Sequence, residues 1–166
     1  GNPEGAYQDF KGCMTIADLT EQFVQAKISF DDALQIVQER KIVYAPDATM
    51  QAMLSDQQGR ALIVEPGIGW REGDGRYSLI TNYSILAPES TMPFLVPGDD
   101  RYERTAQLLS TYGKQFTVTD AFSVLQAVRQ EGIWATRVSF VYSAKEHAVY
   151  YVENNHFSLI ERYEFS

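Results

Sequence analysis

The stretch between Ala61 and Arg104 constrains the fold more than any other part of the sequence. An apolar run with strand character ends in Glu65, and a glycine-rich loop leads from it to a second such run, which ends at Asn82. A long loop without a hydrophobic period follows, and a Pro-Gly-Asp motif at 97–99 then precedes a helical pattern. Long loops of this kind are more often functional than not, so the stretch predicts both a sheet and a site.

The hydrophobic pattern also predicts the elements on either side of this stretch. Ser29 is a suitable N-cap for the second of two early helices, and Thr119 is one for the last helix. The Asp-Gln-Gln-Gly sequence at 56–59 is a turn signal between two strands. The predicted helices cover 16–27, 30–41, 102–112 and 120–130, and the predicted strands cover 49–55, 60–65, 77–81, 136–143, 147–152 and 157–164. Helices grouped between antiparallel strands predict an α+β fold rather than an α/β fold.

Length and composition set the outer limits. The 166 residues fit a single domain over residues 1–166, with residues 1–11 as an exposed lead-in. A net charge of -8 argues against a nucleic-acid partner, because phosphate binding requires a basic face. No apolar run approaches the roughly 20 residues that span a membrane, so we expect no membrane partner. One cysteine and two histidines exclude an internal disulfide and offer little for a metal site, and we expect no cofactor.

Several segments follow one another in an order that is known from one enzyme family. "SFDDALQIVQERKI" is similar to that family's helix before the central strands, and "AMLSDQQGRALIVEP" to its hairpin, whose second strand ends in glutamate. "YSLITN" and "VPGDDRYERTAQLL" are similar to the segments that deliver a site asparagine and a site arginine. "FTVTDAFSVLQAV" and "WATRVSFVYSAKEHAVYYVENN" are similar to a later helix and the closing hairpin. From about Ala17 to Glu164 the chain therefore resembles the linear amide C–N hydrolases, the choloylglycine hydrolase and penicillin V acylase family.

The resemblance implies a fold and a chemistry. The fold is the αββα sandwich of the N-terminal-nucleophile hydrolases, here with the first strands missing, since nothing in the sequence matches the family's nucleophile strand. In that family an N-terminal cysteine uses its own α-amine as base, and its thiolate attacks an amide carbonyl. An asparagine N–H stabilises the oxyanion that forms, and an arginine supports the thiol electrostatically.

Two residues match the family's site. Asn82 corresponds to the asparagine of the oxyanion hole or substrate site, and Arg104 to the arginine, for which Arg101 is the weaker match. The chain is therefore predicted to be a portion of a linear amide hydrolase that lacks the nucleophile and is inactive alone. An N-terminal segment that completed it would give an enzyme acting on a small N-acyl amide. Whether the chain by itself is an enzyme stays open at this point.

Each of these residues also has a structural interpretation. Asn82 can occupy a turn at a strand end. Arg104 can be a surface helix residue paired with Asp100 or Glu103. Glu65 can cap a strand or bind a loop, and for this residue the structural role is preferred.

Cys13 is a further candidate nucleophile, because Gly12-Cys13 resembles the junction at which related acyltransferases cleave themselves. The residues after Cys13 have a helical pattern, whereas a nucleophile strand should continue with β residues. A structural cysteine is therefore preferred over a self-processing acyltransferase that uses Cys13. The other alternative is a non-enzymatic module that binds a small ligand or forms oligomers. On that interpretation, an open sheet edge would pair with a second copy or with another chain.

Overall fold

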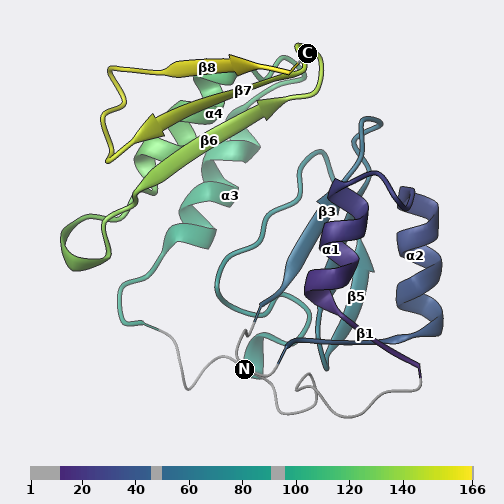
Figure 1. Ribbon diagram of the computed structural model, residues 1–166. Helices are drawn as coiled ribbons and strands as arrows, with labels where there is room; N and C mark the ends of the chain where they lie inside the picture. The colour runs from purple at the N-terminus through teal and green to yellow at the C-terminus, as the bar shows by residue number, and fades with distance from the viewer. Residues whose placement is uncertain (1–11, 46–49, 91–95, 166) are drawn as a thin grey trace. The chain divides into compact units, whose positions relative to one another are not determined.

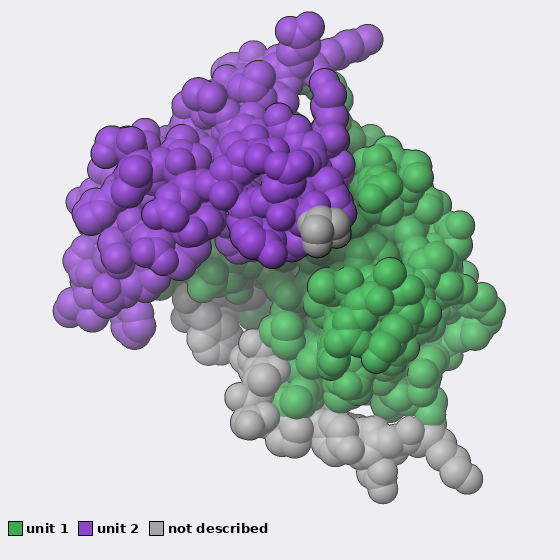
Figure 2. Space-filling model, turned by 45° about the horizontal axis from the view of Figure 1, so that its top comes forward, with its two compact units in different colours: residues 1–98 green, residues 99–166 purple. Residues whose placement is uncertain are grey.

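The computed structural model describes residues 12–45, 50–90 and 96–165. The chain divides into two compact units, residues 1–98 and residues 99–166, which Figure 2 shows in different colours. Each unit is described by itself below. The expected exposed lead-in at residues 1–11 lies outside the described residues, and the single domain over residues 1–166 stays a prediction.

The first unit combines two helices with short strands (Figure 1). Its elements are β1 (Cys13–Thr15), α1 (Ile16–Val24), α2 (Phe30–Glu39), β2 (Lys41–Val43), β3 (Ala52–Ser55), β4 (Ala61–Glu65), β5 (Gly69–Glu72) and a 3-10 turn, η2 (Pro88–Ser90). β1 and β2 pair in parallel, and β3, β4 and β5 form an antiparallel sheet with β4 in the middle. The predicted helices and the β3–β4 hairpin are therefore confirmed.

The β3–β4 turn forms because Asp56 binds the backbone that follows it. Its carboxylate accepts hydrogen bonds from the backbone N–H groups of Gln58 at 3.0 Å and Arg60 at 2.9 Å. Gly59 has a φ of 82°, a conformation that glycine adopts without the steric cost of a side chain. The turn sequence thus fixes the register in which Ser55 faces Ala61.

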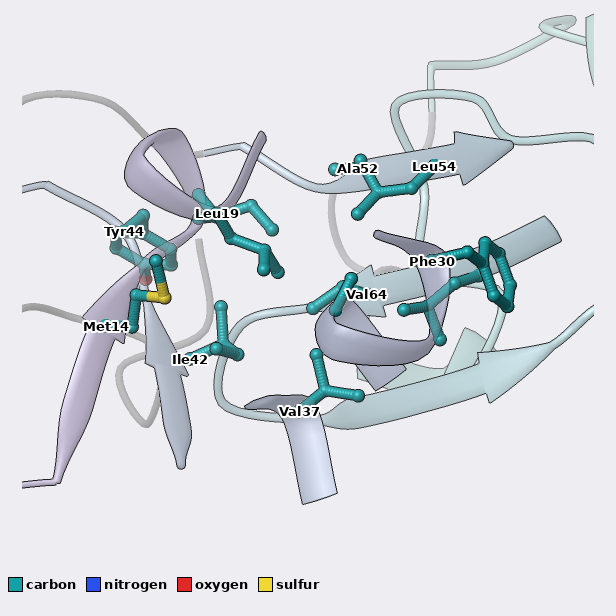
Figure 3. Close-up of a cluster of buried hydrophobic side chains, with 12 residues drawn as sticks. Met14, Leu19, Phe30, Val37, Ile42, Tyr44, Ala52, Leu54 and Val64 are labelled. Carbon is teal, nitrogen blue, oxygen red and sulfur yellow. The ribbon is translucent and has the colours of Figure 1, made fainter. Parts of the chain in front are cut away.

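The core of the first unit lies between the helices and one face of this sheet, as the close-up in Figure 3 shows. Alternate residues of β3 and β4 point into it, because successive side chains of a strand lie on opposite faces. The buried cluster consists of Met14, Ile16, Leu19, Phe30, Ala33, Val37, Ile42, Tyr44, Ala52, Leu54, Leu62 and Val64. Removing this apolar surface from water is the main force that holds α1 and α2 on the sheet.

The second unit has two helices and a three-stranded meander. Its elements are α3 (Arg101–Thr111), α4 (Val118–Ala127), a 3-10 turn, η4 (Gly132–Trp134), β6 (Val138–Ser143), β7 (Ala148–Glu153) and β8 (Glu161–Glu164). The strands pair antiparallel in the order β6-β7-β8, as predicted. Helix α4 lies against β6 (Figure 1), and Ser139, Ala148 and Val152 are the buried residues of the sheet.

Two local predictions are wrong, and one helix ends slightly earlier than expected. Residues 77–81 form no strand; β5 pairs instead with β4, directly after a tight turn, so that β3 and β5 occupy both edges of β4. Helix α2 ends at Glu39 rather than near Lys41, because β2 begins there and pairs with β1. Helix α4 is capped by Thr117 and not by Thr119, since the Thr117 hydroxyl accepts from the Asp120 N–H at 3.1 Å.

These elements make the chain a mixed α/β protein of the α+β type, with four α-helices and two antiparallel sheets in the described residues. None of the helices in the described ranges is long and apolar enough to cross a membrane.

The helix caps predict a dependence of stability on pH. Backbone and side-chain hydrogen bonds from Ser29 hold the pKa of Asp32 below its ordinary value of 3.8, and Thr117 lowers the pKa of Asp120 in the same way. A carboxyl whose pKa is lowered by folding stabilises the protein above its ordinary pKa, and this stabilisation is lost as the pH falls through the lowered value. We expect Asp32→Ala to lower the free energy of unfolding at neutral pH.

Urea unfolding as a function of pH measures this effect. The difference between the wild type and Asp32→Ala should shrink progressively below pH 3.8. Asp74→Ala, in an exposed loop, controls for the loss of one carboxylate. A difference that stays constant down to strongly acidic pH would contradict the role of the ionised cap.

Candidate functional site

The carboxylate of Glu65 is a buried polar group with several hydrogen bonds near the predicted site. Glu65 ends β4 and is 3 % exposed. Its side chain accepts hydrogen bonds from the Ile85 N–H at 2.7 Å, the Leu86 N–H at 3.3 Å and the Ser84 hydroxyl. A buried carboxylate requires such donors, because its charge loses the solvation of water. The preferred interpretation of Glu65, as the residue that binds a loop, is confirmed.

The side chain of Gln51 holds the backbone of the same segment directly before and after Asn82. The Gln51 amide donates to the carbonyl oxygens of Thr81 and, at 3.4 Å, Tyr83. The Tyr83 hydroxyl in turn accepts from the Val96 N–H at 3.1 Å. The backbone on both sides of Asn82 is thus tied to the start of β3, although residues 77–81 form no strand.

The side chain of Asn82 is exposed and makes no hydrogen bond to any described residue. This exposed side chain belongs to a segment that Gln51 and Glu65 hold in place. An amide presented in this way can donate to an oxyanion or to a carbonyl of a ligand. This geometry is compatible with the predicted role, which stays a prediction.

Arg104 lies in the second unit and forms the surface ion pair that the structural interpretation describes. Its guanidinium donates to the Asp100 carboxylate at 2.8 Å and to the Ala127 carbonyl at 3.1 Å, and half of the side chain is exposed. Arg101 is the less exposed of the two and contacts both carboxylate oxygens of Asp99, at 2.8 Å and 2.7 Å. Asn82 belongs to the first unit, whereas both arginines belong to the second.

Cys13 is the first residue of β1 and is half-buried. Its carbonyl accepts from the Arg40 guanidinium at 3.1 Å, and its thiol makes no hydrogen bond to a described residue. β1 has only three residues before α1 begins at Ile16, which agrees with the helical pattern after Cys13. Among the described residues, no base is hydrogen-bonded to the Cys13 thiol to activate it as a nucleophile. Its use in a self-processing acyltransferase stays a prediction.

Histidines and acidic residues form no metal site among the described residues. His147 and His156 are exposed in the turns before and after β7, and the ring of His147 lies 5.6 Å from that of Phe165. No group of three or more His, Cys, Asp or Glu side chains in the described parts of the chain is arranged to hold a metal ion.

Comparison with known proteins adds no relative: no protein-family profile matches the chain, and no curated protein matches it significantly.

Two residues whose hydrogen bonds hold the segment around Asn82 were not predicted from the sequence. Gln51 and Ser84 contact groups that lie far from them in the sequence, and neither belongs to a recognisable motif. Glu65 carried a usable signal, because a charged residue at the end of an apolar strand needs a partner if it is buried.

The contacts of Glu65 predict a graded loss of stability. Glu65→Ala leaves two N–H groups and one hydroxyl without their acceptor and should cost about 3 kcal/mol. Glu65→Gln keeps one acceptor oxygen and should cost about 1 kcal/mol. Urea unfolding measures both values, and hydrogen exchange at the Ile85 and Leu86 amides should accelerate most in Glu65→Ala. Glu89→Ala, at an exposed position of η2, is the matched control and should change stability by less than about 0.5 kcal/mol.

Proposed function

We propose that this chain provides the oxyanion- and substrate-binding part of a linear amide C–N hydrolase of the choloylglycine hydrolase and penicillin V acylase type. The observation that supports the proposal is the exposed position of the Asn82 amide on a fixed backbone. Its side chain is exposed, while Gln51 and Glu65 fix the backbone on either side of it. Hydrogen-bond donors that the fold holds in position stabilise a transition state without having to reorganise during the reaction.

The order of the segments supports the same proposal. The hairpin that ends in a glutamate, the following loop with Asn82 and the helix with Arg104 occur in the family's order. The proposed fold is the αββα sandwich, in which each sheet carries helices on one face and meets another sheet with the other. Each unit combines two helices with a three-stranded antiparallel sheet, to which the first unit adds the parallel pair of β1 and β2, and a helix layer on a sheet is the composition of half a sandwich.

In the proposed reaction a cysteine thiolate attacks the amide carbon and forms a tetrahedral oxyanion, to which Asn82 donates a hydrogen bond. The amine leaves with a proton, and water then hydrolyses the thioester to a carboxylate. Cys13 precedes a helix and binds no base among the described residues, so the proposed nucleophile is a cysteine outside these 166 residues. These 166 residues alone should therefore not hydrolyse an N-acyl amide.

Analysis of the natively purified protein tests this proposal. Mass spectrometry and N-terminal sequencing of every polypeptide in the sample should find a partner that begins with cysteine. The complex should hydrolyse an N-acyl amino acid, and Asn82→Ala should lower kcat by about 100- to 1,000-fold. Gln115→Ala removes an exposed amide elsewhere and should leave kcat unchanged. Turnover by the isolated chain, or full activity of Asn82→Ala, would contradict the proposal.

The alternative is a non-enzymatic module that forms oligomers, and the outer face of the β6–β8 sheet favours it. Val138, Phe140 and Tyr142 alternate along β6 and are 51 %, 66 % and 47 % exposed, and Tyr163 on β8 is 60 % exposed. Large apolar side chains gathered on one sheet face are typical of an interaction surface.

Analytical ultracentrifugation distinguishes this alternative. Phe140→Lys should convert an oligomer to a monomer, because it places a charge at the centre of the apolar face. Ser143→Lys, at the end of β6, introduces the same charge away from that centre and should leave the oligomer intact. A wild-type protein that is monomeric at high concentration would rule out the alternative.

A further inference from the structure

A pocket of about 230 Å³ lies in the first unit, where α2, β2 and the β4–β5 turn meet. Its apolar lining comes from Val37, Ile42, Val64, Ile68 and Trp70. Figure 3 labels the first three of these, which also belong to the buried cluster. Pockets for drug-sized ligands measure about 300–1,000 Å³, so this one suits a smaller molecule.

Two cationic side chains, those of Arg40 and Lys41, belong to the lining of this pocket. Arg40 and Lys41 are exposed lining residues, and the ion pairs among the described residues involve neither of them. The Arg40 guanidinium is oriented by its hydrogen bond to the Cys13 carbonyl at 3.1 Å, which uses only one of its donors. The two cations thus place positive charge beside an apolar cavity in a chain whose net charge is -8.

The carboxylate of Glu65, the remaining charged residue of the lining, does not neutralise them. It accepts hydrogen bonds from Ser84, Ile85 and Leu86 instead. In β4, Glu65 and Val64 also point to opposite faces of the sheet, since neighbouring side chains alternate. Among the charged residues of the lining, the Glu65 carboxylate is therefore engaged by its own donors, whereas Arg40 and Lys41 form no ion pair with a described residue.

We propose that this pocket binds a short-chain aliphatic carboxylate. The alkyl chain would lie against Val37, Ile42 and Val64 beside Trp70, and the carboxylate would bind Arg40 and Lys41. The attraction is strengthened because charge-assisted hydrogen bonds are shorter and stronger than neutral ones. The volume and the charge both select this class over larger or cationic ligands.

This inference does not rest on the proposed amide hydrolase. Asn82, Arg104 and the β6–β8 sheet are not part of the lining. Loss of hydrolysis in an Asn82 variant therefore leaves carboxylate binding unaffected, and failure of carboxylate binding leaves the hydrolase proposal intact.

Tryptophan fluorescence tests the proposal directly. The chain has two tryptophans, and Trp134 is 81 % exposed on η4, so Trp134→Phe leaves Trp70 as the single reporter beside the pocket. Titration of this protein with hexanoate should change the Trp70 emission and saturate with a Kd on the order of 1 mM or below. Hexanamide has the same shape without the charge and should bind at least tenfold more weakly. This comparison needs no further variant.

Substitutions then test whether Arg40 and Lys41 bind the carboxylate of the ligand. In the Trp134→Phe background, the double variant Arg40→Gln and Lys41→Gln should weaken hexanoate binding at least tenfold and leave hexanamide unchanged. Lys27→Gln with Lys114→Gln removes two cations outside the lining and should have no effect. Circular dichroism confirms that each variant is folded. The proposal is overturned by a titration without saturation, by equal affinities for hexanoate and hexanamide, or by wild-type binding in the Arg40 and Lys41 variant.

Discussion

The first unit depends on the burial of strand β4 on both of its faces. All five of its residues are buried, although it lies in a sheet of only three strands. Leu62 and Val64 face the helices, and the opposite face ends in the carboxylate of Glu65. A strand buried in this way requires a cover on both sides, and the second cover must satisfy a charge.

The segment after β5 provides the second cover of β4, and its contacts with Glu65 fix its backbone conformation. Ser78 lies so close to Gly73 that a side chain at residue 73 would collide with its hydroxyl, and Ser84 to Leu86 bind Glu65. Asn82 lies between these two points and is presented outward. The burial of a structural carboxylate and the exposure of the candidate functional amide are therefore two consequences of one arrangement.

Patterns of neighbouring residues were sufficient to predict most of the elements. The Asp-Gln-Gln-Gly turn binds its own backbone, and Ser29 caps its own helix, so both signals act over a few residues. The strand predicted at 77–81 failed for a non-local reason. Its residues have strand character, but β4 pairs with β3 and β5, and residues 77–81 pair with no strand. Pairing partners depend on the whole sheet and not on the propensity of one segment.

By itself, the sequence determined the α+β class, the hairpin and meander, and the identity of Asn82, Arg104 and Glu65 as residues of interest. Only the tertiary structure decided what surrounds each of them. Glu65 binds a loop, and Arg104 pairs with Asp100. Gln51, which is distant in the sequence, binds the carbonyl groups on both sides of Asn82. Arg40 and Lys41 carried no motif, yet the approach of α2, β2 and the β4–β5 turn places them beside an apolar pocket. Local signals act through adjacent backbone groups, whereas burial and pairing arise only when distant segments meet.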